Sequence, residues 1–277
     1  MISTDEADWK LLTDLVAERF GLLFTGSRQE ILCSRLRARL EALRLTEVRE
    51  YYHYLRAHPE RESEFEELAR RLTNNETYFF RDPAQLDAVV GHVVPMLAAR
   101  YPGRPLRLLS AGCSSGEEAY SLAIKLTDAG LELSGVRWSI DACDLNAARL
   151  EHAGRATYDG ASLRACDEAT LRHCFTPSGH RHVLKERYRK HVRFFQANLA
   201  SRTAGFGWGY YDVILCRNLL IYFSPAAFDR LVARFADLLP PGGFLVLGHS
   251  ESLFERTRAF EPVAFPRTVC YKRIGGE

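Results

Sequence analysis

The sequence predicts an α/β domain with a mostly parallel sheet, preceded by an all-helical N-terminal domain and interrupted by a small antiparallel β insertion. Three observations lead to this fold class. Residues 1–72 show helical periodicity without a strand pattern, and residues 106–277 alternate apolar strands with helices. Residues 155–196 break that alternation, and within them residues 183–195 have the pattern of a strand. Strands separated by helices favour a parallel sheet with right-handed crossovers.

The N-terminal domain, residues 1–72, is predicted to consist of helices only. Its apolar residues recur at the spacing of one helix face. Ser27, followed by Glu30 three positions later, has the pattern of a helix N-cap. The predicted helices cover residues 8–20, a segment beginning near Ser27, and residues 48–57 and 61–72.

Three arginines share one face of the second predicted helix. Arg28, Arg35 and Arg39 are seven and four residues apart, and both spacings keep side chains on the same side of a helix. Such a face is either solvated or a docking surface for an acidic partner. From the residues alone, a solvated face is favoured.

Composition narrows the classes of function. The net charge is only +2, which argues against a protein that binds nucleic acid mainly through phosphate contacts. No run of 18 apolar residues occurs, and the acidic N-terminus lacks the regions of a signal peptide, so a cytoplasmic protein without membrane insertion is expected. The seven cysteines include no CxxC pair, so neither a metal site nor a disulfide framework is predicted.

The clearest ligand-binding pattern is a strand, a turn of small residues and a helix, beginning at residue 106. Small residues in the turn Gly112-x-x-x-Gly116 let the backbone approach a ligand at a helix N-terminus. The spacing differs from the GxGxxG of dinucleotide-binding enzymes, and no Gly-Lys-Ser/Thr follows as in a P-loop. Asp144 ends the next strand, where it is either an acceptor for ribose hydroxyls or a helix N-cap.

Two further segments are expected to border the same site. The apolar strand at residues 211–216 stops at Arg217, and open α/β sheets bind ligands at the carboxyl ends of their strands. Residues 73–105 are predicted to form a linker and a bridging helix that begins at Asp82-Pro83 and runs to about Arg100.

Several strings together resemble the chemotaxis receptor glutamate methyltransferases of the CheR family, a group within the class I methyltransferases. In the order of that family, they are TNNETYFFRD, SAGCSSGEEAYSLAI, DLN, FFQANL, DVILCRNLLIYF and PGGFLVLGHSESL, spread over residues 73–253. Ser114 replaces the middle glycine of the usual class I loop, and Ser110 replaces its acid. The resemblance implies a Rossmann-like methyltransferase domain over residues 106–277.

The resemblance also implies a cofactor, S-adenosylmethionine, with S-adenosylhomocysteine as the product. Two residues, Arg81 and Tyr222, are expected to border the methyl group and to orient the incoming carboxylate. The implied cofactor-binding residues are Asn75, Thr77, Arg81, Glu118, Asp144, Asn198, Leu199, Cys216 and Arg217.

The implied reaction is methyl transfer to glutamate side chains of methyl-accepting chemotaxis receptors by a monomer. A glutamate, with a reference pKa of about 4.3, is already ionised at neutral pH and needs no general base. Catalysis is therefore expected from positioning and desolvation. With the resemblance, docking of the acidic, helical methylation region on Arg28, Arg35 and Arg39 becomes the favoured function of that face.

The insertion and two other functions complete the predictions. The insertion at residues 155–196 resembles the small β-subdomain of the family, and its short turn at residues 176–182 favours recognition without a tethered receptor peptide. A methyltransferase acting on a small molecule or RNA is disfavoured by the specific strings and the near-neutral charge. A non-catalytic cofactor-binding signalling scaffold is the alternative, disfavoured because Arg81, Asp144, Arg217 and Tyr222 are all present.

Overall fold

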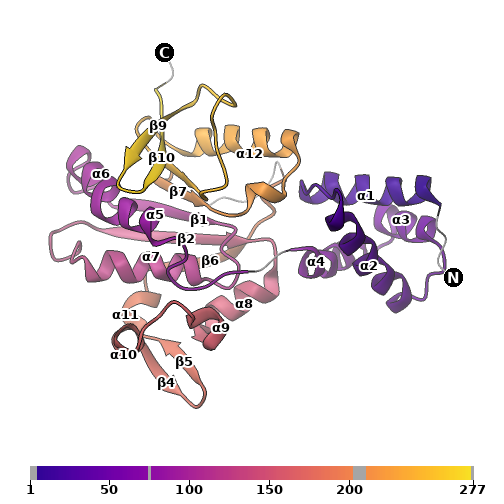
Figure 1. Ribbon diagram of the computed structural model, residues 1–277, viewed down its shortest axis with the longest axis horizontal. Coiled ribbons are helices and arrows are strands. Elements are labelled where there is room, and N and C mark those ends of the chain that lie inside the picture. The colour runs from indigo at the N-terminus through magenta and orange to yellow at the C-terminus, as the bar shows by residue number, and fades with distance from the viewer. Residues whose placement is uncertain (1–4, 74–75, 202–209, 276–277) are drawn as a thin grey trace.

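The computed structural model describes residues 5–73, 76–201 and 210–275. A helical domain lies beside an α/β domain, as the sequence predicts (Figure 1). The helical domain contains α1 (Glu6–Phe20), α2 (Ser27–Ala42), α3 (Val48–Ala57) and α4 (Arg61–Leu72). Within the described ranges, no helix is both long and apolar enough to cross a lipid bilayer.

The ends of α1 and α2 follow from local chemistry. The Asp5 carboxylate caps α1 by accepting from the backbone N–H of Ala7 at 2.8 Å. The N-cap expected at Ser27 is wrong, because Ser27 is the first helical residue and Gly26 precedes it with φ 57°. Glycine suits that entry because positive φ costs it little.

The two domains share one apolar core. Gly21 ends α1 with φ 71°, and a Cβ atom there would lie 2.9 Å from the Ala200 Cβ of the α/β domain. Buried Leu12 and Leu36 of the helical domain belong to the same cluster as Phe235 of α12 (Pro225–Leu238). Burial of this continuous apolar surface holds the helical domain against the α/β domain.

The bridging helix is not uniform. It consists of α5 (Pro83–Ala88), the π-helical turn η1 (Val89–Val93) and α6 (Val94–Arg100). Pro95, in the first turn of α6, has no N–H for the preceding turn, which accounts for the local change in helix type.

The main sheet has seven strands in the order β6-β2-β1-β7-β8-β10-β9. All neighbouring pairs are parallel except the two that involve β10, which confirms the expected mostly parallel sheet. Helix α7 (Glu117–Asp128) covers one face together with the bridging helix, and α12 packs on the other. The strands are β1 (Leu106–Ala111), β2 (Trp138–Asp144), β6 (Val192–Gln196), β7 (Val213–Cys216), β8 (Phe244–Leu247), β9 (Phe260–Phe265) and β10 (Thr268–Arg273).

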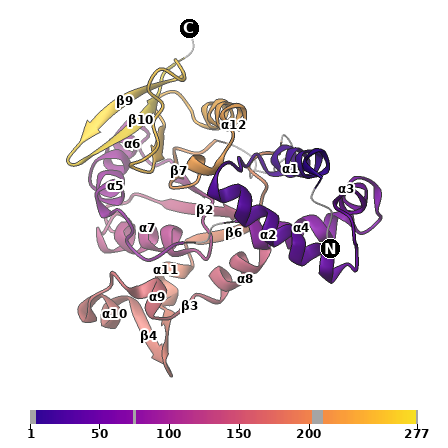
Figure 2. The ribbon, with the colours of Figure 1, turned by 45° about the vertical axis from the view of Figure 1, so that its right-hand side comes forward.

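The insertion after α8 (Ala147–Arg155) forms a second, antiparallel sheet in the order β3-β5-β4. It lies at the opposite end of the domain from β9 and β10 (Figure 1, Figure 2). Its elements are β3 (Thr157–Tyr158), α9 (Gly160–Leu163), α10 (Glu168–Cys174), β4 (Phe175–Ser178), β5 (Arg181–Leu184) and α11 (Glu186–Arg189).

One strand expected in this region is wrong. The sequence predicts a continuous strand-like segment over residues 183–195, but the short helix α11 divides it. Tyr188 is fully buried on α11, which breaks the alternation of a strand. The last part becomes β6, which pairs with β2 in the main sheet, so the small sheet ends at Leu184.

Candidate active site

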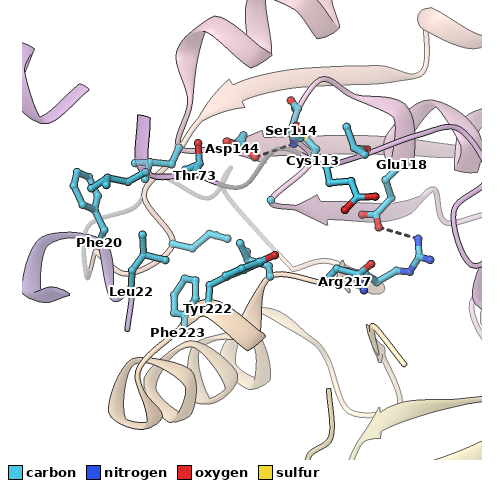
Figure 3. Close-up of a pocket in the computed structure, with 18 of the residues that line it drawn as sticks. Phe20, Leu22, Thr73, Cys113, Ser114, Glu118, Asp144, Arg217, Tyr222 and Phe223 are labelled. Atoms are coloured by element: carbon cyan, nitrogen blue, oxygen red, sulfur yellow. Dashed lines mark hydrogen bonds and ion pairs between the residues drawn. The ribbon is translucent and has the colours of Figure 1, made fainter. Parts of the chain in front are cut away.

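A cavity of about 400 Å³ opens at the carboxyl ends of β1, β2 and β7, between the two domains. This volume is within the range of small-molecule and cofactor sites. Figure 3 shows side chains from both domains facing the same space. Among the sequence-predicted residues, those that line it are Thr77, Arg81, Glu118, Asp144, Asn198, Leu199, Arg217, Tyr222, Arg28 and Arg35.

The glycine loop, residues 110–116, is folded tightly at one side of this cavity. Gly112 and Gly116 have φ values of 81° and 91°, and a Cβ on Gly112 would lie 2.7 Å from the Cδ2 of Leu219. Ser114, where the usual class I loop has its middle glycine, also has positive φ, at 50°. Its hydroxyl is buried and finds no hydrogen-bond partner among the described residues, so it is available to a ligand.

Asp144 connects this loop to the end of β2. Its carboxylate accepts from the backbone N–H of Ser114 and of Asn146, both at 2.8 Å. Burial raises the pKa of the Asp144 carboxyl, and the N–H groups of Asn146 and Ser114 oppose that rise. The alternative role of helix cap belongs to Asn146, whose side chain accepts from the N–H of Arg149 at the start of α8.

Arg217 and Glu118 form a buried ion pair at the end of β7, with 3.0 Å between Nη1 and Oε2. The Arg217 side chain is only 2% exposed. Its other N–H groups donate to Oε1 of Gln85 at 2.5 Å and to the carbonyl of Arg81 at 2.6 Å. Glu118 also accepts from the Ser110 hydroxyl at 2.7 Å. The pair therefore joins the glycine loop, the bridging helix and the linker.

The linker forms a second wall. Thr77 and Arg81 line the cavity, and the Arg81 guanidinium donates to the carbonyl of Glu76 at 2.8 Å. Phe79 is not part of the described lining; it is fully buried and packs against Tyr158 of the insertion. Asn75, an expected cofactor contact, lies outside the described residues.

Asn198 and Leu199 line the cavity on the side of the helical domain. The Asn198 amide donates to the carbonyl of Arg19 in α1 at 2.7 Å, so this corner is closed by the N-terminal domain. Cys216 differs from the other predicted residues. It is fully buried at the end of β7 and is not part of the described lining.

Tyr222 lies in the short helix η2 (Leu220–Tyr222), opposite the glycine loop (Figure 3). Its carbonyl accepts from the N–H of Leu23 at 2.8 Å, and Leu22 forms an antiparallel bridge with Phe223. The Arg28 guanidinium lies over the Tyr222 ring, 4.7 Å from its centroid. The helical domain thus holds the segment that carries Tyr222.

The predicted arginine face is only partly present at the cavity. Arg28 and Arg35 line it, but Arg39 is 12% exposed and pairs with buried Glu64 at 2.6 Å. Glu64 also accepts a hydrogen bond from the Tyr51 hydroxyl. Hydrogen bonding to Glu64 raises the pKa of Arg39. Arg39 is therefore held in an internal network, and only Arg28 and Arg35 remain of the predicted docking face.

Sequence reasoning missed the apolar wall contributed by the helical domain. Phe20, Leu22 and Leu72 line the cavity, although helical periodicity assigns such residues to an ordinary core. It also missed Gln85, which donates to the carbonyl of Leu247 and accepts from Arg217. Nothing in the local sequence distinguishes these positions, because their partners are distant in the chain.

Comparisons with known proteins cover almost the whole chain. The family model described as "CheR methyltransferase, SAM binding domain" matches residues 75–269, and "CheR methyltransferase, all-alpha domain" matches residues 7–73. The chain is 33% identical to "Chemotaxis protein methyltransferase 2" of Vibrio cholerae, over 96% of this chain and 92% of that protein. It is 31% identical to "Chemotaxis protein methyltransferase Cher2" of Pseudomonas putida, covering 91% and 92%. It is also 31% identical to "Chemotaxis protein methyltransferase" of Salmonella typhimurium, covering 94% and 88%.

Proposed function

The chain belongs to the CheR methyltransferase family, and from this premise we propose that it methylates glutamate side chains of chemotaxis receptors. It is an enzyme whose cofactor is S-adenosylmethionine. The alternative of a non-catalytic signalling scaffold is therefore not retained. The observation that carries the proposal is a single cavity with two kinds of wall. One wall is the glycine loop with Asp144, and the other bears Arg28 and Arg35, which suit an acidic substrate.

The residues present fit the cofactor. When bound, S-adenosylmethionine supplies an electrophilic methyl group on a sulfonium sulfur. In the proposal, the Asp144 carboxylate accepts from the ribose hydroxyls. The Ser114 hydroxyl, which has no hydrogen-bond partner within the described part of the chain, belongs to the same lining. Asn198 and Leu199 border the adenine, and Glu118, Arg217, Thr77 and Asn75 complete the site through the loop and the linker.

Arg81 and Tyr222 are the proposed catalytic residues. The substrate glutamate is ionised at neutral pH, so the site needs no proton acceptor. The Arg81 guanidinium and the Tyr222 hydroxyl orient the attacking carboxylate, while Phe20 and Leu22 exclude water from the cavity. A mechanism without a proton acceptor agrees with the absence of histidine from the lining of the described cavity.

The proposed substrate is protein, not nucleic acid, and the proposed enzyme is a cytoplasmic monomer. The net charge of +2 supports the choice against nucleic acid. Arg28 and Arg35, which line the cavity, are the proposed contacts of the acidic, helical methylation region. The β4–β5 hairpin turns between Ser178 and Arg181, and this short turn supports recognition without a tethered receptor peptide.

The test is transfer of a labelled methyl group to a purified receptor cytoplasmic fragment, detected as base-labile esters. A fragment whose methylatable glutamates are replaced by alanine is the substrate control. Arg81→Ala should lower kcat strongly, whereas Arg172→Ala, an arginine whose side chain is 75% exposed, should leave it unchanged. Cofactor binding without ester formation would contradict the proposed reaction. Equal effects of the two substitutions on kcat would contradict the proposed role of Arg81.

A further inference from the structure

Glu251 follows β8 in the string GHSES, and it contacts the turn that directly precedes Tyr222. Its side chain is buried, with the residue 8% exposed. The carboxylate accepts from three backbone N–H groups, those of Gly248 at 2.7 Å, Asn218 at 2.9 Å and Ile221 at 3.3 Å. This carboxylate therefore joins the end of β8 to the turn after β7.

The neighbouring backbone has the conformation that this connection requires. Asn218 has φ 56°, which is unusual for a residue with a side chain. A Cβ atom on Gly248 would lie 2.8 Å from both the Asn218 nitrogen and the Glu251 Oε2. Only glycine therefore leaves room for the carboxylate and the turn to meet at this point.

The turn fixed by Glu251 carries two residues of the active site. Leu219 contacts the glycine loop, since its Cδ2 occupies the space that a Cβ on Gly112 would need. Tyr222 follows Ile221 directly and lines the cavity. Glu251 itself is not part of the described lining, so it acts on the site only through this backbone.

We propose that Glu251 is a positioning residue for methyl transfer, because its carboxylate fixes residues 218–221 and thereby the place of Tyr222 in the cavity. The inference rests on the proposed function for its kinetic readout only. A residue that merely stabilises the fold would affect activity whether or not Tyr222 has its hydroxyl. A positioning residue that acts through Tyr222 loses most of its effect once that hydroxyl is gone.

The experiment compares Glu251→Gln in the wild-type and Tyr222→Phe backgrounds. The carboxamide keeps the size of the side chain but turns one acceptor into a donor that faces backbone N–H groups. We expect kcat to fall about tenfold in the wild-type background, with S-adenosylhomocysteine affinity within about threefold. In the Tyr222→Phe background, the same substitution should change kcat by less than about threefold. Glu255→Gln, an exposed glutamate of the same loop, is the matched control.

Equal losses in the two backgrounds, or an unchanged kcat, would overturn the proposal. If Glu251→Gln does not fold, Gly248→Ala perturbs the same junction between β8 and the turn at Asn218. A loss of cofactor affinity as large as the loss of kcat in that variant would also contradict a positioning role for Glu251. Fluorotyrosine incorporated at Tyr222 gives a readout that needs no reaction. Its fluorine resonance should shift in Glu251→Gln and stay in Glu255→Gln. An inactive wild type with a shifted resonance would refute the proposed substrate and support Glu251, whereas an unshifted resonance would overturn the role of Glu251.

Discussion

Replacing Arg217 with methionine should lower the melting temperature of the chain by about 6–20 °C. The Arg217 side chain is 2% exposed, and its removal leaves the Glu118 carboxylate, 14% exposed, without its cation. Breaking a buried pair by removing one partner costs about 3–5 kcal/mol. For a chain of this size, each kcal/mol shifts the midpoint by about 2–4 °C. The carbonyls of Arg81 and Asp82 lose a donor as well, so S-adenosylhomocysteine affinity should fall with stability.

Thermal unfolding of two further variants tests this prediction. Arg193→Met removes a partner of Asp141, but the Arg193 side chain is 67% exposed, so the expected cost is about 1 kcal/mol or less. The double variant Glu118→Gln, Arg217→Met should be more stable than Arg217→Met alone, because no unpaired carboxylate remains in the interior. Equal melting temperatures for Arg217→Met and Arg193→Met would contradict the predicted cost of breaking the buried Arg217–Glu118 pair. A double variant no more stable than Arg217→Met alone would contradict it as well.

Further predictions concern the cavity lining and the predicted arginine face. Asp144→Asn should weaken S-adenosylhomocysteine binding about tenfold or more, measured by calorimetry, because a carboxamide loses a charged acceptor. Since burial raises the pKa of Asp144 in the ligand-free fold, its contribution to stability is present below the unfolded pKa and is lost as the pH rises through the folded pKa. Asp144→Asn should remove that part of the stability curve, and superimposable curves would contradict the shift. Gly112→Ala should also reduce cofactor affinity, because the new Cβ, at φ 81° and 2.7 Å from Leu219, displaces the turn; unchanged affinity would show that the loop relaxes freely. Arg35→Glu should raise the KM for a receptor fragment without changing the melting temperature. Arg39→Glu should lower the melting temperature, because the new carboxylate faces Glu64. The reverse pattern in kinetics and thermal unfolding would indicate that Arg39, and not Arg35, contacts the receptor.

The sequence predicted those parts of the site that are built from local segments. The strand, glycine turn and helix from Leu106 to Asp128, and Asp144 at the end of β2, all lie where the pattern of apolar and small residues placed them. These features depend on neighbours a few positions away, so periodicity and turn chemistry suffice to find them. Arg217 at the end of β7 is of the same kind.

The features that the sequence did not reveal depend on contacts between distant residues. Arg39 has the spacing of an exposed face, but Glu64 of a different helix takes its charge into the interior. The strand β6 looks like part of the insertion until its pairing with β2 is known. Glu251 and Gln85 are polar residues near element ends, and only the fold shows which backbone groups they reach.

The bridge between Leu22 and Phe223 has a consequence for the nascent chain. About 200 residues separate the two partners, and synthesis at about 5–20 residues per second takes about 10–40 s to cross that distance. The helical domain therefore leaves the ribosome well before the segment that covers Phe20 and Leu22 has been made. During that interval Leu22 lacks the partner that it has in the folded protein, and a polypeptide interrupted before Phe223 never acquires it.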